Sequence, residues 1–301
     1  MPILGSKFGY IDKSGHFVIP PQFDRCYDYT DGLATVEIEG KYGFIDKNGH
    51  FAIPPQFEWA LGFSEGIAAV FINGKYGYID KSATTVIPPT FEEVNDFSDG
   101  LAYVRTNTQK GYINHTGAWE LIPPSYYDCW APFCDGLAVA GVCREDEMNS
   151  RGYTADWECT GEGYIDKTGA IVIPPQFREV DDFSEGLAHV EIETGEHVFI
   201  DMMGDVAVKF DFDYASYYPY FSEGLINVKI DGKYGFADKM GRVVVEPQFK
   251  EAYRFSEGLA AARVKERWGY IDKTGEWMIE PKYLEAHNFS DGLALVLEVL
   301  N

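Results

Sequence analysis

Basic side chains are scarce in this sequence. It has 25 Lys and Arg against 48 Asp and Glu, which gives a formal net charge of −23 at pH 7. A chain this acidic is repelled by phosphate backbones and by anionic lipid headgroups, so we expect it to bind neither nucleic acid nor a membrane. The partner that fits this charge is another protein with a basic surface, and a small ligand is the alternative.

Long apolar runs and a cysteine framework are missing as well. No run of 18 apolar residues occurs, so the sequence predicts no transmembrane helix. The start, MPILGSKFGYID, lacks the charged and apolar regions of a signal peptide. The five cysteines are an odd number, which does not indicate a disulfide framework. We therefore expect a cytoplasmic protein.

What the sequence does contain is a repeat. A Gly-aromatic-Ile-Asp unit recurs, and its first four copies are 34 residues apart. A second anchor, FSEGL or FSDGL, stays in phase with the first, which indicates eight copies of one supersecondary unit. The eight units begin at Gly9, Gly43, Gly77, Gly111, Gly163, Val198, Gly235 and Gly269.

Each repeat is typical of β structure. Alternating apolar residues follow each FSEGL anchor and predict a strand. Asn73-Gly74 and Asp231-Gly232 then favour a tight hairpin, because both accept positive φ. A second strand, a glycine turn such as residues 12–15, and a third strand ending in Ile-Pro-Pro complete the unit. The sequence therefore predicts a three-stranded β-meander plus a connecting segment, and an all-β fold.

The repeated acids are interpreted as turn formers rather than as catalytic or calcium-binding groups. An Asp with a Gly three residues later accepts backbone N–H bonds within its own turn. The acid of the FSEG anchor is interpreted in the same way, as turn or local capping chemistry. Two cysteines, Cys26 and Cys129, occupy a position that takes only small residues and are predicted to be core residues. The turn acids are Asp12, Asp46, Asp80, Asp166, Asp201, Asp238 and Asp272.

The pattern Lys-aromatic-Gly-aromatic-Ile-Asp, a glycine turn, a proline and FSEGLA resembles the bacterial WG-repeat family (WG β-hairpin repeats). The literal Trp-Gly pair occurs at Trp268-Gly269, and Tyr42-Gly43 and Phe8-Gly9 place another aromatic there. The sixth repeat departs most, with Val198 in place of the glycine and residues 208–212 in place of the prolines. The resemblance implies a repeat scaffold of binding proteins, and it supplies no catalytic residues.

The architecture expected is a single domain of residues 1–301, a tandem array of eight ~34-residue three-stranded β-meander repeats. Left bare, residues 295–300 would form an apolar edge prone to aggregation. We expect an open superhelix whose ends are capped. The alternative is a closed propeller-like ring, in which the last strand pairs with residues 8–12.

Departures from the repeat point to recognition. The largest is an insertion at about residues 143–159, in the hairpin turn of the fourth repeat. Arg, Tyr and Trp often anchor protein interfaces, whereas a surface insertion without a role is the alternative. The candidate partner-binding residues are Arg144, Arg151, Tyr153 and Trp157.

Cysteines and aromatics mark two further departures. Cys143 and Cys159 flank the insertion and could form a disulfide across an extended hairpin, although free thiols are expected in a cytosolic chain. The cysteine spacings do not match a zinc site. Residues 210–221 are rich in Tyr and Phe, either as core fillers or as an exposed patch for a sugar or peptide.

No convergent catalytic set is visible. The histidines are scattered, and no nucleophile elbow, zincin motif, P-loop or dinucleotide fingerprint occurs. We therefore expect no enzyme, no cofactor and no metal. The leading hypothesis is a scaffold for protein–protein interaction. The alternatives are a small-ligand or glycan-binding module that uses aromatic rows, and a hydrolase whose acids converge across repeats.

Overall fold

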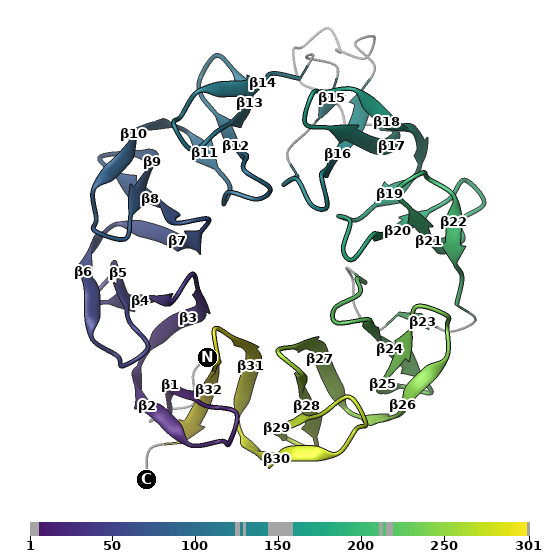
Figure 1. The fold of residues 1–301 in the computed structure, drawn as a ribbon. Coiled ribbons are helices and arrows are strands. Elements are labelled where there is room, and N and C mark those ends of the chain that lie inside the picture. The colour runs from purple at the N-terminus through teal and green to yellow at the C-terminus, as the bar shows by residue number, and fades with distance from the viewer. Residues whose placement is uncertain are drawn as a thin grey trace, which may run out of the picture. The chain divides into compact units, whose positions relative to one another are not determined.

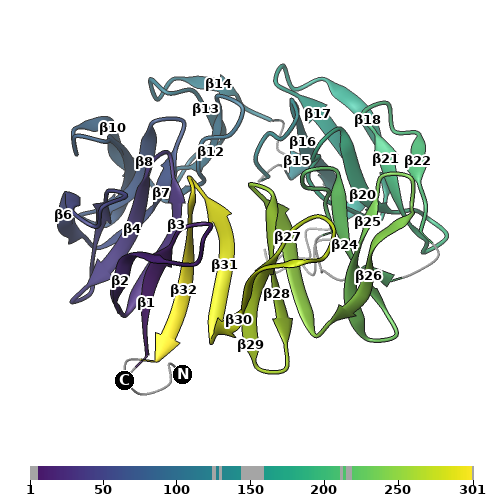
Figure 2. The same cartoon turned by 60° about the horizontal axis from the view of Figure 1, so that its bottom comes forward.

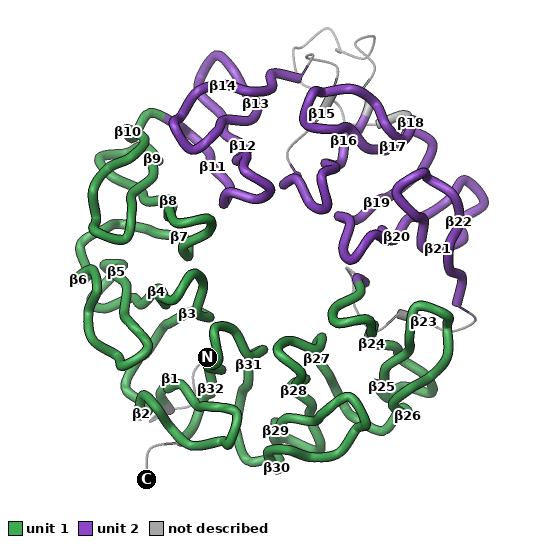
Figure 3. Tube along the Cα trace, viewed as in Figure 1, with its two compact units in different colours: residues 1–90, 212–217, 221–301 green, residues 91–211, 218–220 purple. Residues whose placement is uncertain are grey.

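The computed structural model describes residues 6–123, 127–128, 131–143, 159–210, 213–214 and 219–299. Within these ranges every helix or strand element is a β-strand, and the strands form eight four-stranded antiparallel sheets (Figure 1). The chain divides into two compact units, residues 1–90, 212–217 and 221–301, and residues 91–211 and 218–220 (Figure 3). All-β tandem structure is thus confirmed.

The first unit contains five sheets. Its strands are β1 (Ser6–Ile11), β2 (Phe17–Phe23), β3 (Arg25–Thr30), β4 (Leu33–Ile38), β5 (Lys41–Ile45), β6 (Phe51–Phe57), β7 (Trp59–Ser64), β8 (Ile67–Ile72), β9 (Lys75–Asp80), β10 (Thr85–Phe91), β23 (Asp213–Tyr214), β24 (Leu225–Ile230), β25 (Lys233–Asp238), β26 (Val243–Phe249), β27 (Glu251–Ser256), β28 (Leu259–Val264), β29 (Arg267–Ile271), β30 (Trp277–Tyr283), β31 (Glu285–Ser290) and β32 (Leu293–Val299). The strand orders are β2-β1-β32-β31, β3-β4-β5-β6, β7-β8-β9-β10, β23-β24-β25-β26 and β27-β28-β29-β30.

The second unit contains three sheets of the same design. Its strands are β11 (Glu93–Val94), β12 (Ala102–Arg105), β13 (Lys110–Ile113), β14 (Trp119–Leu121), β15 (Tyr127–Asp128), β16 (Leu137–Cys143), β17 (Cys159–Asp166), β18 (Ile171–Phe177), β19 (Glu179–Val180), β20 (Leu187–Glu191), β21 (His197–Asp201) and β22 (Val206–Val208). The orders are β11-β12-β13-β14, β15-β16-β17-β18 and β19-β20-β21-β22.

Each repeat supplies four strands, not the expected three. The segment predicted as a connector is the first strand of the next sheet, for example β3 after β2. The Ile-Pro-Pro strand does not stop at its prolines either, because Phe23 of β2 still pairs with Phe8 of β1. Where a strand contains these prolines, as β2, β6, β10 and β18 do, it is an edge strand of its sheet, where a missing N–H breaks no ladder.

Both chain ends meet in one sheet. β1 pairs antiparallel with β32, from Ser6 opposite Val299 to Ile11 opposite Ala294 (Figure 2). The expectation of an open superhelix is therefore wrong, because the last strand does not end as a bare or capped edge. The propeller alternative, which requires this pairing, is confirmed, and the four-stranded sheets are blades of the β-propeller class.

The core lies between successive sheets. In the first unit one cluster joins Ile11 of β1 to Tyr270 and Tyr283, and another joins Tyr10 to Tyr29 and Val36. Cys26 is buried in the second cluster, as predicted, whereas Cys129 lies outside the described residues. Of the aromatic stretch 210–221, Phe210 and Phe221 are buried core residues. The side chains of residues 211–218 lie outside the described part.

The Asp-x-x-Gly turns form as predicted. Asp12 Oδ1 accepts hydrogen bonds from Ser14 N (2.9 Å), Ser14 Oγ and His16 N (3.1 Å). The Ser14 hydroxyl is the first cause, and backbone N–H groups a further cause, of a lowered pKa for Asp12. The corresponding bonds recur at Asp46, Asp80 and Asp272, so these acids are turn formers.

Candidate binding surface

The FSEGL turns have an unusual backbone. Their acid has positive φ in each repeat, although a side chain makes this conformation costly. The acid and the following Gly together form a tight turn in which both central residues have positive φ. The acids are Asp31 (53°), Glu65 (53°), Asp99 (54°), Asp135 (52°), Glu185 (53°), Glu223 (53°), Glu257 (53°) and Asp291 (57°).

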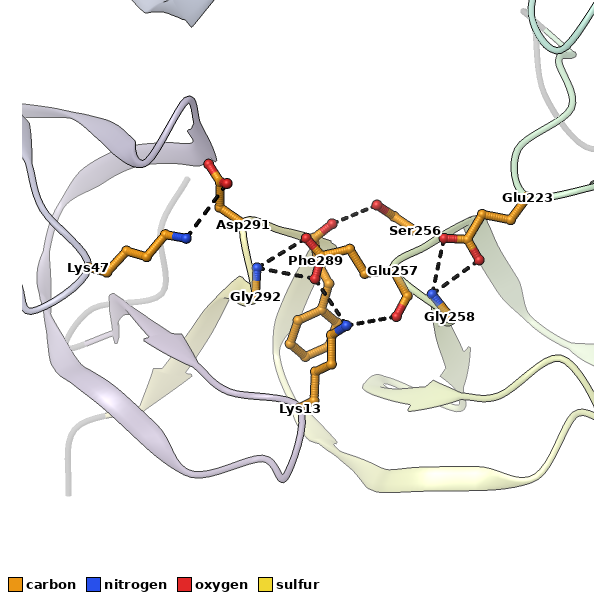
Figure 4. A network of polar contacts seen from close by, with 9 residues as sticks. All are labelled: Lys13, Lys47, Glu223, Ser256, Glu257, Gly258, Phe289, Asp291 and Gly292. Atoms are coloured by element: carbon orange, nitrogen blue, oxygen red, sulfur yellow. Dashed lines mark hydrogen bonds and ion pairs between the residues drawn. The ribbon is translucent and has the colours of Figure 1, made fainter. Parts of the chain in front are cut away.

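In the first unit the carboxylate of this turn accepts a hydrogen bond from the glycine N–H of the next sheet's FSEGL turn. We call this contact the turn latch (Figure 4). The pairs are Asp31 with Gly66 (2.6 Å), Glu223 with Gly258 (3.1 Å), Glu257 with Gly292 (3.0 Å) and Asp291 with Gly32 (2.7 Å).

Contacts of Ser256 and Lys13 reinforce the latch of Glu257. Ser256 Oγ donates to the Phe289 carbonyl at 2.7 Å, and Lys13 Nζ lies 2.9 Å from the Glu257 carbonyl and 3.1 Å from its Oε2 (Figure 4). The interpretation of this acid as local capping chemistry was too narrow, because its bonds join different repeats. In the second unit Asp99 and Asp135 make the same contact with Gly136 and Gly186. This end of the sheets is therefore occupied by structural bonds.

A β-bulge interrupts the first strand of the blades. In β3 the register shifts between Cys26 and Tyr29, so two residues face one on β4. We call these two residues the bulge pair. The bulge pairs of the first unit with this register shift are Tyr27-Asp28, Leu61-Gly62, Tyr253-Arg254 and His287-Asn288.

The bulge pairs vary while their surroundings do not. The residue before each pair is small, and the residue after it is a buried aromatic, as with Ala252 and Phe255. The pairs themselves hold tyrosine, leucine, glycine, histidine, asparagine, arginine or aspartate. Bulges often re-aim side chains beside binding sites. A constant frame that presents different side chains at one position is the arrangement expected of a recognition surface.

A tyrosine hydroxyl fixes the backbone of these bulges. Tyr10 donates to the carbonyl of Tyr27 at 2.8 Å, and Tyr270 donates to the carbonyl of His287 at 2.8 Å. Each bond runs from the aromatic of Gly-aromatic-Ile-Asp to the bulge of the next sheet. In the second unit Tyr164 binds the carbonyl of Asp181 in the same way.

Where this tyrosine is a phenylalanine, the residue directly opposite it is polar. Phe44 faces Thr35, whose Oγ1 donates to the Leu61 carbonyl at 3.3 Å. Phe236 faces Asn227, whose Nδ2 donates to the carbonyl of Ala252, next to the bulge pair, at 3.2 Å. Phe199 faces His189. At Phe44 and Phe236, a polar side chain on the neighbouring strand thus donates the hydrogen bond that a tyrosine hydroxyl makes in other blades.

Polar groups of three blades gather at the bulges of the first unit. His287 Nδ1 lies 3.3 Å from Asp28 Oδ1, without the geometry of a hydrogen bond. The Asp28 carboxylate raises the pKa of His287. Burial lowers the pKa of Arg254 on β27, and Asp28 opposes this change. Asp28 Oδ1 and Asn288 Oδ1 are both buried and accept no hydrogen bond.

Aromatic side chains line the same bulges. Tyr27 is 46% exposed and stacks on Tyr42, with ring centroids 6.4 Å apart. Tyr253 is 44% exposed and lies against Trp268 at 4.7 Å. Two aromatic pairs therefore lie at these bulges, and the aromatic of the Trp-Gly position forms one member of each pair.

In two sheets of the second unit the corresponding positions hold aspartates, Asp96 in one and Asp181 and Asp182 in the other. Burial raises the pKa of Asp96 to about 6, and burial together with the neighbouring Asp181 raises the pKa of Asp182 to about 6. Asp181 Oδ2 lies 2.8 Å from His189 Nδ1. Across the described ranges no group of three or more His, Cys, Asp or Glu could hold a metal ion.

The predicted insertion lies on the hairpin β16–β17. The candidate partner-binding residues Arg144, Arg151, Tyr153 and Trp157 lie outside the described residues. The backbone register places Cys143 directly opposite Cys159, as the disulfide alternative requires. In the part of the chain with assigned structure, no helix is long and apolar enough to cross a membrane.

The family model described as WG containing repeat matches the chain seven times. The chain belongs to this family. The Trp-Gly repeat therefore accounts for the frame of the blades, whereas the bulge pairs lie between its constant positions. The matched residues are 8–42, 42–76, 76–107, 163–193, 199–234, 234–268 and 268–298.

Solved structures share the fold of these WG repeats. A eukaryotic initiation factor is similar over 94% of this chain and 87% of its own, at 9% identity and a TM-score of 0.56. The computationally designed Ika8 protein is similar over 87% and 86%, at 12% identity and 0.52. BamB from Moraxella catarrhalis is similar over 99% and 95%, at 12% identity and 0.45. No curated protein matches the sequence.

Sequence reasoning missed the bulge pairs as a site. Aligning the repeats on their FSEGL anchors would have exposed them, because the two residues before each buried aromatic change most from repeat to repeat. The search for departures instead favoured length changes, which drew attention to the insertion.

Proposed function

We propose that this protein is a non-catalytic scaffold for protein–protein interaction and that its bulge pairs form the recognition surface. The observation that carries the proposal is the variation of the bulge pairs within a constant frame. The inter-sheet bonds at Tyr27 and His287 hold that surface in a fixed conformation. A fixed surface loses little conformational entropy on binding.

The chemistry of the surface supports a protein partner. Half-exposed tyrosines are typical anchors of interfaces, and Tyr27 and Tyr253 are both of this kind. The net charge of −23 favours a partner with a basic surface and raises the rate of association with it at low salt. We propose the insertion, with Arg144, Arg151, Tyr153 and Trp157, as a second recognition element.

Capture from source-cell lysate with four proteins tests the proposal. The bulge variant is Tyr27→Ser/Tyr253→Ser, and the loop variant replaces residues 144–158 by Asn-Gly. The control, Val18→Ser/Val244→Ser, changes exposed residues on edge strands. We expect a partner that the wild type and the control retain and the bulge variant loses. Equal capture by all four proteins would contradict the proposal.

The loop variant separates the two recognition elements. Loss of the partner from the loop variant alone would place recognition on the insertion, and loss from both variants would show that the two elements act together. Thermal unfolding of each variant shows whether the fold is retained. A bulge variant that unfolds at the same temperature as the wild type and still loses the partner supports the proposal most directly.

A small-ligand function is the second candidate, and a hollow in the first unit favours it. The hollow has a volume of about 630 Å³ and lies beside β2 and β6. Exposed Phe51 offers a face for stacking, and Gln22, Asp24 and Glu37 offer hydrogen-bond partners for hydroxyl groups. A rise in thermal stability with an oligosaccharide, absent in Phe51→Ser, would support this function.

A further inference from the structure

We propose that the bulges of β3 and β31 form a binding site for an alkylammonium group, with Asp28 as its counter-ion, and that a lysine side chain of the partner protein supplies this group. The inference rests on the proposed function, because it names the chemistry that the bulge surface recognises.

Unsatisfied acceptors point to a ligand with donors. Asp28 Oδ1 and Asn288 Oδ1 lie on neighbouring blades, and both are buried without a hydrogen bond. A buried acceptor without a partner is costly, the more so when it carries charge. An ammonium group has three donors and no acceptor, so it satisfies acceptors and introduces no new unpaired oxygen.

The carboxylate is accessible from solvent. The Asp28 side chain is 40% exposed, so a group arriving from solvent can reach the carboxylate, although Oδ1 itself is buried. Charge favours a cation, because the His287 imidazole beside Asp28 is charged only when it is protonated; Arg254 is the second basic group that acts on Asp28. Exposed faces of Tyr27, in the bulge of β3, and of Tyr253, in the bulge of the neighbouring strand β27, suit the methylene stem and the charge of a lysine.

His287 makes the site dependent on pH. Three charged groups act on it or on its partner: Asp28 on β3, Glu285 on its own strand and Arg254 on β27. The ring of Phe8 on β1 lies against its edge at 6.4 Å. A protonated His287 neutralises Asp28 and competes with the ligand. Binding of an ammonium group should therefore strengthen as the pH rises through the raised pKa of His287.

An NMR titration with the capped peptide Gly-Gly-Lys-Gly-Gly tests the site on the full chain. The comparison probes are the same peptide with acetyl-lysine, and free butylammonium. We expect the lysine peptide to bind about ten-fold tighter than the acetylated one, since the Asp28 charge acts on the ammonium alone. Asp28→Asn, which has the same shape, should lose this preference.

Glu58→Gln is the matched control, because Glu58 is an exposed carboxylate on the link between β6 and β7. It should bind like the wild type. His287→Gln should keep the lysine preference and lose the pH dependence. Equal binding by wild type and Asp28→Asn, or no difference between the two peptides, would overturn the proposal. Thermal unfolding of Asp28→Asn confirms that the fold is intact.

Partner capture and the peptide titration together also distinguish a failure of this inference from a failure of the proposed function. Partner capture without lysine preference leaves the scaffold in place and removes the ammonium site. Lysine preference without partner capture keeps the site and removes the scaffold. Butylammonium that binds as tightly as the peptide would overturn the partner lysine as the source and identify a free small amine instead.

Discussion

Asn227 lies directly opposite Phe236, and its amide donates to the Ala252 carbonyl on the neighbouring blade. Other blades use a tyrosine hydroxyl for this inter-blade bond, as at Tyr10 and Tyr270. The bond has therefore been moved from one strand to its neighbour while its target has stayed beside the bulge. Thr35 and Phe44 show the same exchange in another blade.

This exchange predicts a rescue. Thr35→Ala removes the donor to the Leu61 carbonyl and a buried methyl group, so we expect it to lower the free energy of unfolding by about 1–2 kcal/mol. Adding Phe44→Tyr, which copies the arrangement of the other blades, should restore about 1 kcal/mol. Urea unfolding measures both changes. Thr85→Ala, an exposed threonine on β10, is the control and should be neutral. A double variant no more stable than Thr35→Ala would contradict the exchange.

The turn latch predicts an order of stabilities at Glu257. Glu257→Ala loses the hydrogen bond from Gly292 N and the ion pair with Lys13. The bond from Lys13 to the Glu257 carbonyl and the costly positive φ remain, so we expect the free energy of unfolding to fall by about 1–2 kcal/mol. Glu257→Gly loses the same bonds but adopts positive φ easily, and should be about 1 kcal/mol more stable than the alanine variant. Chemical unfolding checks the order. If glycine were the worse replacement, the strain at this turn would not exist.

The glycine of the Trp-Gly motif is required for close approach. A Cβ at Gly43 would lie 2.6 Å from Pro55 N and 2.7 Å from the Ile53 carbonyl, both backbone atoms. We expect Gly43→Ala to lower the free energy of unfolding by about 3 kcal/mol or more. Gly40→Ala is the matched comparison, since Gly40 has φ of 76° but no atom within 4 Å of its Cβ position. It should cost about 1 kcal/mol, and equal losses at both sites would refute the steric explanation.

The raised pKa of Asp182 predicts a pH-dependent gain. Its folded-state pKa of about 6 lies above the ordinary value of 3.8, so the ionised carboxylate destabilises the fold above pH 6 and this penalty disappears as the pH falls toward 4. After allowance for solvent screening, Asp182→Asn should stabilise the protein by about 1 kcal/mol at pH 8 and by nothing at pH 4. Thermal unfolding at both pH values measures the difference. An equal gain in stability at both pH values would show that the gain comes from packing and not from the removed charge.

Local patterns in the sequence predicted the hairpins and the turns. Asn73-Gly74 has the expected positive φ at both residues, and Asp12 makes the expected turn bonds. These contacts span few residues, so residue type alone determines them. The family resemblance also held, because its two anchors form the frame of the blades.

The fourth strand was missed for a physical reason. β3 buries Cys26 and Tyr29, which are three residues apart, because the bulge adds a residue between them. A strand normally alternates with a period of two, so this spacing conceals it. The same bulge conceals the candidate site. The pairing of β1 with β32 and the turn latch join distant parts of the chain, and local patterns say little about such contacts.

The sheet built from both chain ends has a consequence for how the protein is made. β1 emerges from the ribosome well before its partner β32, which runs to Val299. Until β32 has been made, β1 can pair only with β2, so this blade is completed later than the blades that lie between these two strands in the sequence. Contacts between such distant residues close slowly, because a long loop must be ordered first. A chain that terminates before β32 therefore leaves β1 without its partner and cannot complete this blade.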